Sequence, residues 1–322
     1  MIHFQNDFAN LQKGEATMKN ESGLKLAYLC AVLNAVIIGF SFLFTKVALE
    51  HANPVDTLMH RFAVSFVVMS IPVAFGWVKF KFRGKLLALL LLATMYPVGF
   101  FLFQAFGLQH ASSAEGGILY AFTPIVTMVL ASVFLKEVTT LFQKVSIFLS
   151  VSGVVLIFVM KGADFDFSNF TGIFLLLMSS LAFAGYSVLV RSLLRVYSPT
   201  EISYVMLGIG FVSFSAVSIT THVADGTLDL LLAPLTSGSF VVSILYLGVL
   251  SSLVTALTAN YALSKIEASR MSVFANLGTV VSIIAGAIFL GEEITVHHLI
   301  GSALIIAGVI GANRLGRKKV TA

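Results

Sequence analysis

The sequence predicts an all-α membrane protein with ten transmembrane helices, arranged as two inverted five-helix repeats. Three observations predict this fold. Hydrophobic residues make up 58% of the 322 residues and charged residues only 11%, whereas a soluble domain has roughly 45–50% and 25%. Ten apolar runs have about the length that crosses a bilayer. The second half of the chain also repeats the residue pattern of the first half.

The apolar runs predict helices rather than barrel strands, because they are continuous and lack alternation. They cover residues 26–46, 56–78, 86–107, 112–135, 143–160, 170–190, 202–221, 238–260, 269–290 and 297–313. The first run follows a polar segment and has no cleavage site before a soluble domain, so we expect it to remain as a helix. Pro72, Pro97 and Pro124 fall inside runs of the first half and predict bent helices there.

The basic residues predict the orientation, because cytoplasmic loops collect Lys and Arg. With the N-terminus inside, 17 of the 20 Lys and Arg residues face the cytoplasm, and Lys46, Arg61 and Lys161 lie at outer ends. We therefore expect both termini to be cytoplasmic and the protein to lie in the cell's inner (plasma) membrane. The net charge of +5 follows from this bias and does not indicate nucleic-acid binding.

An internal repeat divides the chain. A shift of 155 residues matches Leu135 with Leu290, Glu137 with Glu292 and Gly153 with Gly308, and a shift of 145 matches Lys46 with Arg191 and Pro54 with Pro199. Five spans per half place the halves in opposite orientations, an arrangement typical of transporters. The predicted organisation is a cytoplasmic tail (1–24), a first repeat (25–162), a second repeat (168–314) and a basic tail (315–322).

Two stretches of each half carry a family resemblance. They are Thr123-Pro124 with Phe134-Leu135-Lys136-Glu137, the helix around Gly153, residues 287–293, and the Gly-rich run 301–308. These stretches resemble the EamA type of the drug/metabolite transporter superfamily over residues 25–314. Lys136 stands where that family favours Gly, and Thr279 stands where the first half has Pro124. The resemblance implies a small-solute carrier and does not name the solute.

Glu115 is the sharpest candidate for function, because ionisable groups inside a membrane are costly and usually functional. It lies about one turn into run 112–135, followed by Gly116 and Gly117. Desolvation would suit it to proton coupling, although a helix-capping carboxylate at the membrane interface is an equal alternative. Under the 155-residue shift Glu115 falls on Arg270. The two matched positions are hypothetical outer and inner gates, although positive-inside bias alone also explains Arg270.

Arg61 is the first choice as a partner for Glu115, since it is the outer cation deepest in its helix and Arg tolerates a buried pair. Lys46 is a further gating candidate, although snorkelling to head groups explains it better. The polar residues inside the runs complete the substrate-site candidates, and at least half of them are expected only to bond helices together. They are Gln104, Tyr120, Asn276, Asn34 and Tyr186.

The sequence contains none of the enzyme motifs sought, and neither a cofactor nor a metal is expected. The leading interpretation is a secondary transporter that exports an amino acid or related metabolite by alternating access through a central cavity. One alternative is a nucleotide-sugar or phosphorylated-sugar carrier, which would need several mid-span cations. Another is an intramembrane enzyme acting on lipid or peptide, and a third is a receptor or scaffold. Proton coupling remains a hypothesis that depends on Glu115.

Overall fold

The structure is a computed structural model and describes residues 2–77, 85–107, 110, 119–160, 170–290 and 293–314. Apolar helices make up most of these residues. Within these residues there are no strands. The elements are α1 (Ile2–Leu49), α2 (Pro54–Ala74), α3 (Leu86–Ala93), η1 (Thr94–Gly99), α4 (Phe100–Gly107), α6 (Thr123–Phe134), α7 (Leu141–Met160), α8 (Phe170–Leu193), α9 (Pro199–Asp225), η3 (Leu228–Leu230), η4 (Ala233–Thr236), α10 (Gly238–Leu245), η5 (Tyr246–Val254), α11 (Thr255–Lys265), α12 (Ala268–Ser272), α13 (Phe274–Leu290) and α14 (Val296–Arg314).

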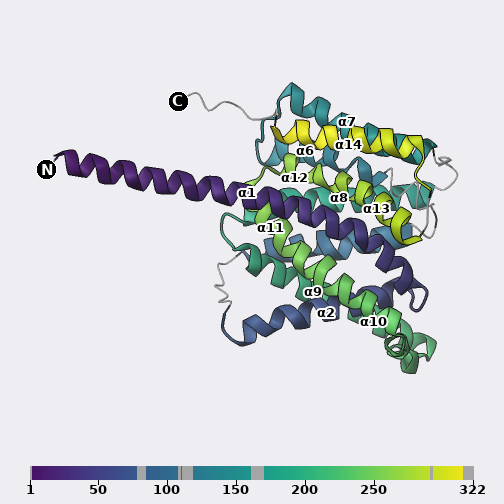
Figure 1. The fold of residues 1–322 in the computed structure, drawn as a ribbon. Coiled ribbons are helices and arrows are strands. Elements are labelled where there is room, and N and C mark those ends of the chain that lie inside the picture. The colour runs from purple at the N-terminus through teal and green to yellow at the C-terminus, as the bar shows by residue number, and fades with distance from the viewer. Residues whose placement is uncertain are drawn as a thin grey trace.

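Nine of the ten predicted runs correspond to helical segments long and apolar enough to cross a membrane, counted over the described residues. The tenth, run 112–135, is described only as the shorter apolar helix Leu119–Phe134. The multi-pass membrane prediction is confirmed by these segments, whereas the full count of ten spans stays a prediction. Figure 1 shows α1 running far beyond the bundle at its N-terminal end, since the helix begins at Ile2 rather than near the predicted start of the run.

Local sequence explains where the long helices begin and end. Asn53 caps α2 by accepting from the Asp56 backbone N–H at 2.9 Å. Ser198 and Glu201 form a reciprocal capping box at the start of α9. That helix ends at Gly226, whose left-handed φ of 66° is a conformation that glycine adopts without a steric penalty.

Helices from the two halves of the sequence pack against each other throughout the bundle (Figure 1). The most extensive contact is between α7 and α14, and α2 packs along α9. The helix α1 contacts α11 and α13, and α8 contacts α4 and α6. Close approach of α7 and α14 depends on small residues: a Cβ built on Gly153 would lie 2.6 Å from the carbonyl oxygen of Gly301.

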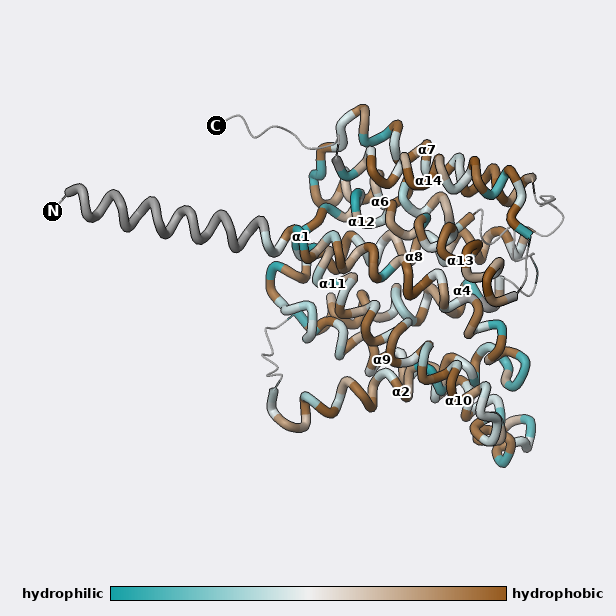
Figure 2. The backbone as a smooth tube through the Cα atoms, viewed as in Figure 1, coloured by the Kyte–Doolittle hydropathy of each residue, from teal (hydrophilic) through white to brown (hydrophobic). Residues whose placement is uncertain are grey.

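The outer surface of the bundle is apolar. Leu87 and Ile288 are 81% and 69% exposed, as are many other large hydrophobic side chains. In Figure 2 the hydrophobic colour covers the helices, and hydrophilic residues gather toward the helix ends and loops. A continuous apolar surface of this kind would be unstable in water and matches a lipid environment.

Two helices of the bundle depart from regular α-helical geometry. The element η1 contains Pro97 and breaks the path from α3 to α4, where Tyr96 has non-helical angles (φ −145°, ψ 123°). The element η5 is a π-helical stretch between α10 and α11, and the helix Gly238–Lys265 continues through it. The bend at Pro97 agrees with the sequence expectation, but η5 contains no proline. Under the 155-residue shift Tyr96 matches Ser251, so the two irregular segments occupy equivalent places in the two halves.

Candidate functional site

Arg61 is the cation most deeply placed in the part of the bundle that the structure describes. It lies seven residues beyond the start of α2, roughly 10 Å along the helix axis at 1.5 Å per residue. Arg61 is only 8% exposed. Every residue from Asp56 to Phe62 is buried, so this part of α2 is enclosed on all sides rather than facing lipid on one.

The guanidinium of Arg61 forms hydrogen bonds with η5, the π-helical stretch in the second half. Its Nε–H donates to Ser252 Oγ at 2.6 Å. Its Nη2 donates to the Ser251 carbonyl oxygen at 3.0 Å and to Ser251 Oγ at 3.1 Å. One turn further along α2, Ser65 Oγ donates to the Gly248 carbonyl oxygen at 2.9 Å. These bonds use carbonyl and hydroxyl groups on η5, where the wide turn changes the usual pattern of helix hydrogen bonds.

Aromatic rings enclose the guanidinium on its other sides. Arg61 Cζ lies 5.0 Å from the ring centroid of Phe101 and 6.0 Å from that of Phe62, within the range of a cation–π interaction. Tyr96, from η1, places its ring centroid 5.7 Å from that of Phe101 and lines the same cavity as Phe62 and Ser252. The elements η1 and η5 therefore meet at one arginine on α2.

The positive charge of Arg61 has no carboxylate partner among the described residues. The ion pairs of this part of the chain are Arg191 with Glu137, His222 with Asp56 and Arg270 with Glu267. Neutral acceptors stabilise a buried guanidinium but do not cancel its charge, and an unpaired buried charge costs several kcal/mol, about 3–5 when a partner is removed. An anionic ligand would remove this cost.

A small cavity adjoins this group. Its volume is about 10 Å³, just enough for a single water molecule. The residues that line it are Phe62, Tyr96, Pro97, Met206, Leu207, Ser252 and Ala256. A solute larger than water therefore needs the surrounding helices to move apart before it can bind here.

A buried hydrogen-bonded chain begins beside Tyr96 and lies in the second half. The Tyr96 and Tyr186 rings are 4.8 Å apart between centroids. The Tyr186 hydroxyl donates to Asn260 Oδ1 at 2.8 Å, and Asn260 Nδ2 donates to Ser203 Oγ at 2.8 Å. Tyr186 is one of the predicted site residues, whereas Asn260 is not. The Asn260 side chain is fully buried and joins α11 to α8 and α9.

The other polar candidates from the sequence are spread along the bundle. Asn34 is buried and donates to the Thr255 carbonyl oxygen at 2.9 Å, directly after η5. Tyr120 packs its ring 5.8 Å from those of both Phe100 and Phe183. These two lie close to the elements around Arg61.

None of the remaining polar candidates, Asn276, Gln104 and Lys46, has a described contact with the residues around Arg61. Asn276 is buried and donates to Ser150 Oγ at 3.1 Å, which joins α13 to α7. Gln104 is half-buried in α4 and has no hydrogen bond among the described residues. Lys46 is exposed near the end of α1, as a cation that reaches toward head groups would be.

Of the two gate candidates matched by the repeat, Glu115 and Arg270, the structure describes one. Glu115 lies outside the described residues, so its pairing with Arg61 stays a prediction. Arg270 lies in α12, and its Nε is 2.7 Å from Glu267 Oε2. Arg270 is therefore bound to a carboxylate of its own loop at the end of the bundle opposite the start of α2.

A polar cluster that the sequence did not reveal closes this end of the bundle. Glu137, directly after α6, accepts from the backbone N–H of Ala268 at 2.9 Å and of Ser269 at 3.2 Å, and from Ser269 Oγ at 2.8 Å. Arg191 Nε lies 3.0 Å from Glu137 Oε1, and its Nη1 donates to the carbonyl oxygens of Leu263 and Ile266. A first-half carboxylate thus caps a second-half helix.

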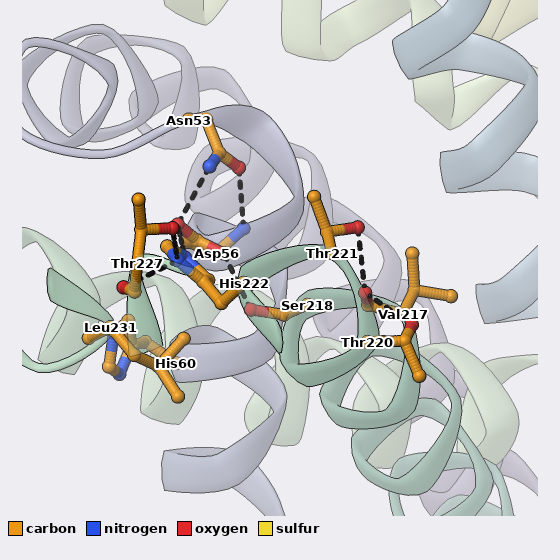
Figure 3. Close-up of polar contacts among 10 residues, drawn as sticks. All are labelled: Asn53, Asp56, His60, Val217, Ser218, Thr220, Thr221, His222, Thr227 and Leu231. Atoms are coloured by element: carbon orange, nitrogen blue, oxygen red, sulfur yellow. Dashed lines mark hydrogen bonds and ion pairs between the residues drawn. The ribbon is translucent and has the colours of Figure 1, made fainter. Parts of the chain in front are cut away.

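A second polar cluster joins α2 to α9 at the opposite end of the bundle (Figure 3). Asp56 Oδ1 accepts from Ser218 Oγ at 2.5 Å, and Asp56 Oδ2 lies 2.9 Å from His222 Nε2. The other ring nitrogen of His222 contacts Thr227 Oγ1 at 2.8 Å. One turn deeper, His60 contacts the Leu231 carbonyl oxygen at 3.1 Å. These bonds join the start of α2 to the end of α9 and to the turns η3 and η4 that follow it.

Ser251, Ser252 and Tyr96 are the site residues that sequence analysis missed. Hydroxyl residues in an apolar run normally bond to their own helix, so nothing in the run itself distinguished them. A signal was present in the repeat, since the 155-residue shift matches Tyr96-Pro97 with Ser251-Ser252. Within the described residues no three His, Cys, Asp or Glu side chains gather to hold a metal ion.

Comparison with known proteins places this architecture in a family. The model of the EamA-like transporter family matches residues 25–159 and again residues 170–314. The uncharacterized transporter YcxC of Bacillus subtilis is 46% identical over 89% of this chain and 92% of its own length. A protein of Streptantibioticus cattleyicolor, named a probable terminal-alkyne amino-acid exporter, is 25% identical over 92% of this chain and 97% of its own.

A solved structure has the same fold. It superposes with a TM-score of 0.76 over 90% of this chain and 97% of its own length, at 17% sequence identity. The family and the names of the relatives indicate a transporter rather than an enzyme. Two successive matches to one family model, nine apolar membrane-length helices among the described residues and a 46% identical relative together show that this chain belongs to the EamA-like transporter family.

Proposed function

We propose that the protein exports an amino acid or related metabolite by alternating access, with Arg61 at the centre of the transport path. The observation that carries the proposal is that two irregular helical segments, η1 and η5, one from each half, lie beside a buried arginine without a carboxylate partner among the described residues. Transporters of inverted-repeat design bind their solutes where helices of the two repeats lose regular geometry near the middle of the membrane.

The packing supports movement between the halves. Each extensive helix contact described above joins one helix of the first half to one of the second, and the central cavity holds no more than a water molecule. Both ends of the bundle are also bridged by polar clusters, around Asp56 and around Glu137. These features suit a contracted conformation that opens by separating the two inverted repeats.

The proposed substrate contacts begin with Arg61 and include the other polar candidates from the sequence, which lie on several helices. They comprise Arg61, Tyr186, Asn34, Tyr120, Gln104, Asn276 and Glu115. Lys46, Glu115 and Arg270 are the proposed gate residues, and we propose the inner membrane as the location, with both termini cytoplasmic. The name of the Streptantibioticus relative supports an amino-acid solute and the direction of export. A nucleotide-sugar carrier is less favoured, since Arg61 is the one mid-helix cation around this cavity in the described part of the chain.

Counterflow in proteoliposomes tests the proposal. Purified protein is reconstituted and loaded with each unlabelled metabolite of a panel of amino acids, organic acids, amines and sugar phosphates, and uptake of the labelled compound is followed with and without a pH gradient. We expect exchange of at least one amino acid or close relative. Absence of exchange for every compound would contradict the carrier proposal, and exchange that ignores the pH gradient would remove proton coupling.

A further inference from the structure

The edges of the Arg61 guanidinium are unequally occupied. Its Nε–H bonds to Ser252, and its Nη2 bonds twice to Ser251. Its Nη1 has no hydrogen bond among the described residues. Phe101 covers one face of the group. A ligand therefore reaches the guanidinium most readily in its plane, at the edge shared by Nη1 and Nη2.

A carboxylate is the group that fits this edge. Two parallel N–H···O bonds between an arginine and a carboxylate are stronger and more directional than bonds to neutral oxygens. The present acceptors on Nη2 are a hydroxyl and a carbonyl of Ser251, both neutral. Replacing them by a carboxylate adds one bond at Nη1 and neutralises a charge that has no carboxylate partner among the described residues.

We propose that Arg61 recognises the carboxylate of the transported solute, which takes Nη1 and Nη2 in place of Ser251 while Ser252 keeps the guanidinium in position. This inference rests on the proposed function, because it assumes that the central site is the transport site. It narrows the solute to compounds with a free carboxylate.

Among the described groups that contact Arg61 or line the cavity there is no Asp or Glu. Recognition by Arg61 itself therefore depends on the carboxylate and not on the amino group of the solute. We expect the deaminated acid to bind as the amino acid does, and the amide and the decarboxylated amine to bind poorly.

The same exchange links binding to movement. Arg61 belongs to α2 in the first half, and Ser251 belongs to η5 in the second. A carboxylate that displaces Ser251 removes two hydrogen bonds between the halves and leaves the Arg61 side chain with its one bond to Ser252. The solute thereby weakens the contact that must separate when the central site opens.

Thermal stabilisation of the purified full-length protein in detergent tests this inference with two matched probe series. One series is leucine, leucinamide, its decarboxylated amine and its deaminated acid, and the other is the same set built on phenylalanine. We expect stabilisation by the amino acids and the deaminated acids only. Equal stabilisation by all members of a series, stabilisation by the amine or amide alone, or none by any acid would overturn the proposal.

Variants assign the effect to Arg61. Arg61→Gln should raise the concentration for half-maximal stabilisation by roughly tenfold to a hundredfold, the usual effect of losing hydrogen bonds to a charged group. Arg61→Lys should retain part of the binding, because it keeps the charge without the bidentate edge. Ser252→Ala should weaken binding, whereas Ser251→Ala should tighten it by removing one of the two competing acceptors, the hydroxyl, while the backbone carbonyl remains.

Ser65→Ala is the matched control, since it also loses a hydrogen bond between α2 and η5 but leaves the guanidinium untouched. It should keep the preference for acids over amides. Loss of that preference in Ser65→Ala, or its survival in Arg61→Gln, would contradict the assignment. Proteoliposome flux separates the two proposals: exchange of amines without exchange of acids leaves the carrier function standing and rejects carboxylate recognition.

Discussion

Nε2 of His222 lies 2.9 Å from Oδ2 of Asp56, so the last turn of α9 is tied to the first turn of α2. The ion pair of Arg191 with Glu137 lies near the other end of α9, whose 27 residues span roughly 40 Å. Arg61 lies between these two levels along α2. The contracted central site is thus bounded by a polar cluster at each end of the bundle.

The hydrogen bonds around Asp56 should stabilise the end of the bundle at which α2 begins. Ser218 is fully buried and donates to Asp56 at 2.5 Å, so Ser218→Ala leaves one carboxylate oxygen with fewer donors. We expect the free energy of unfolding in detergent to fall by about 1–3 kcal/mol. Thr220→Ala is the control, because the exposed Thr220 hydroxyl bonds only to backbone oxygens of its own helix. Equal effects of the two substitutions would contradict the role of the cluster.

The contacts of Glu137 should contribute more to the free energy of unfolding than the neighbouring ion pair of Arg270 with Glu267. Glu137→Ala removes the cap of α12 and leaves Arg191 without its carboxylate, and we expect a loss of about 2–3 kcal/mol, the range for bonds to charged groups. Glu267→Gln breaks the more exposed pair with Arg270 and should cost less than about 1 kcal/mol. Thermal unfolding of both variants measures the difference, and a larger effect at Glu267 would contradict it.

Lys136 adopts a left-handed conformation at the end of α6, with φ at 55°. The Glu137 N–H returns to the Ala131 carbonyl oxygen at 3.2 Å, which closes the end of the helix. Glycine avoids the penalty of about 1–2 kcal/mol that an L side chain incurs there, against an entropic cost of roughly 0.5–1 kcal/mol. Lys136→Gly should therefore raise stability by up to about 1 kcal/mol. Lys144→Gly, within α7, should lower it by about 1 kcal/mol, and destabilisation by both would reject the argument.

The gate hypothesis is tested by Glu115→Gln and Arg270→Gln in the reconstituted protein. If Glu115 gates the outer side and carries a proton, Glu115→Gln should slow exchange and flatten its response to pH. Arg270→Gln should alter the exchange rate with less effect on pH response, since its partner is Glu267. Unchanged rates and pH profiles in both variants would exclude gating by these matched positions.

Local backbone features at position 136 and at Pro97 could be predicted from the sequence, whereas η5 could not. The resemblance identified Lys136 as a departure from the family pattern, and the structure supplies the reason in a left-handed backbone. Pro97 likewise predicted a bend that is present in η1. By contrast, η5 has no proline or charged residue to mark it, because its wide turn depends on packing against α2 and on acceptors that Arg61 binds.

The sequence by itself determined that the chain lies in lipid, since too few polar residues exist to cover its apolar surface, and it determined the family through local motifs that are repeated in the two halves. Arg61 could be singled out because a charge inside an apolar run is costly wherever it lies. The tertiary structure decided which groups meet that charge. Ser251 and Ser252 are 190 and 191 residues away in the chain, and only the packing of η5 on α2 brings their oxygens within hydrogen-bonding distance.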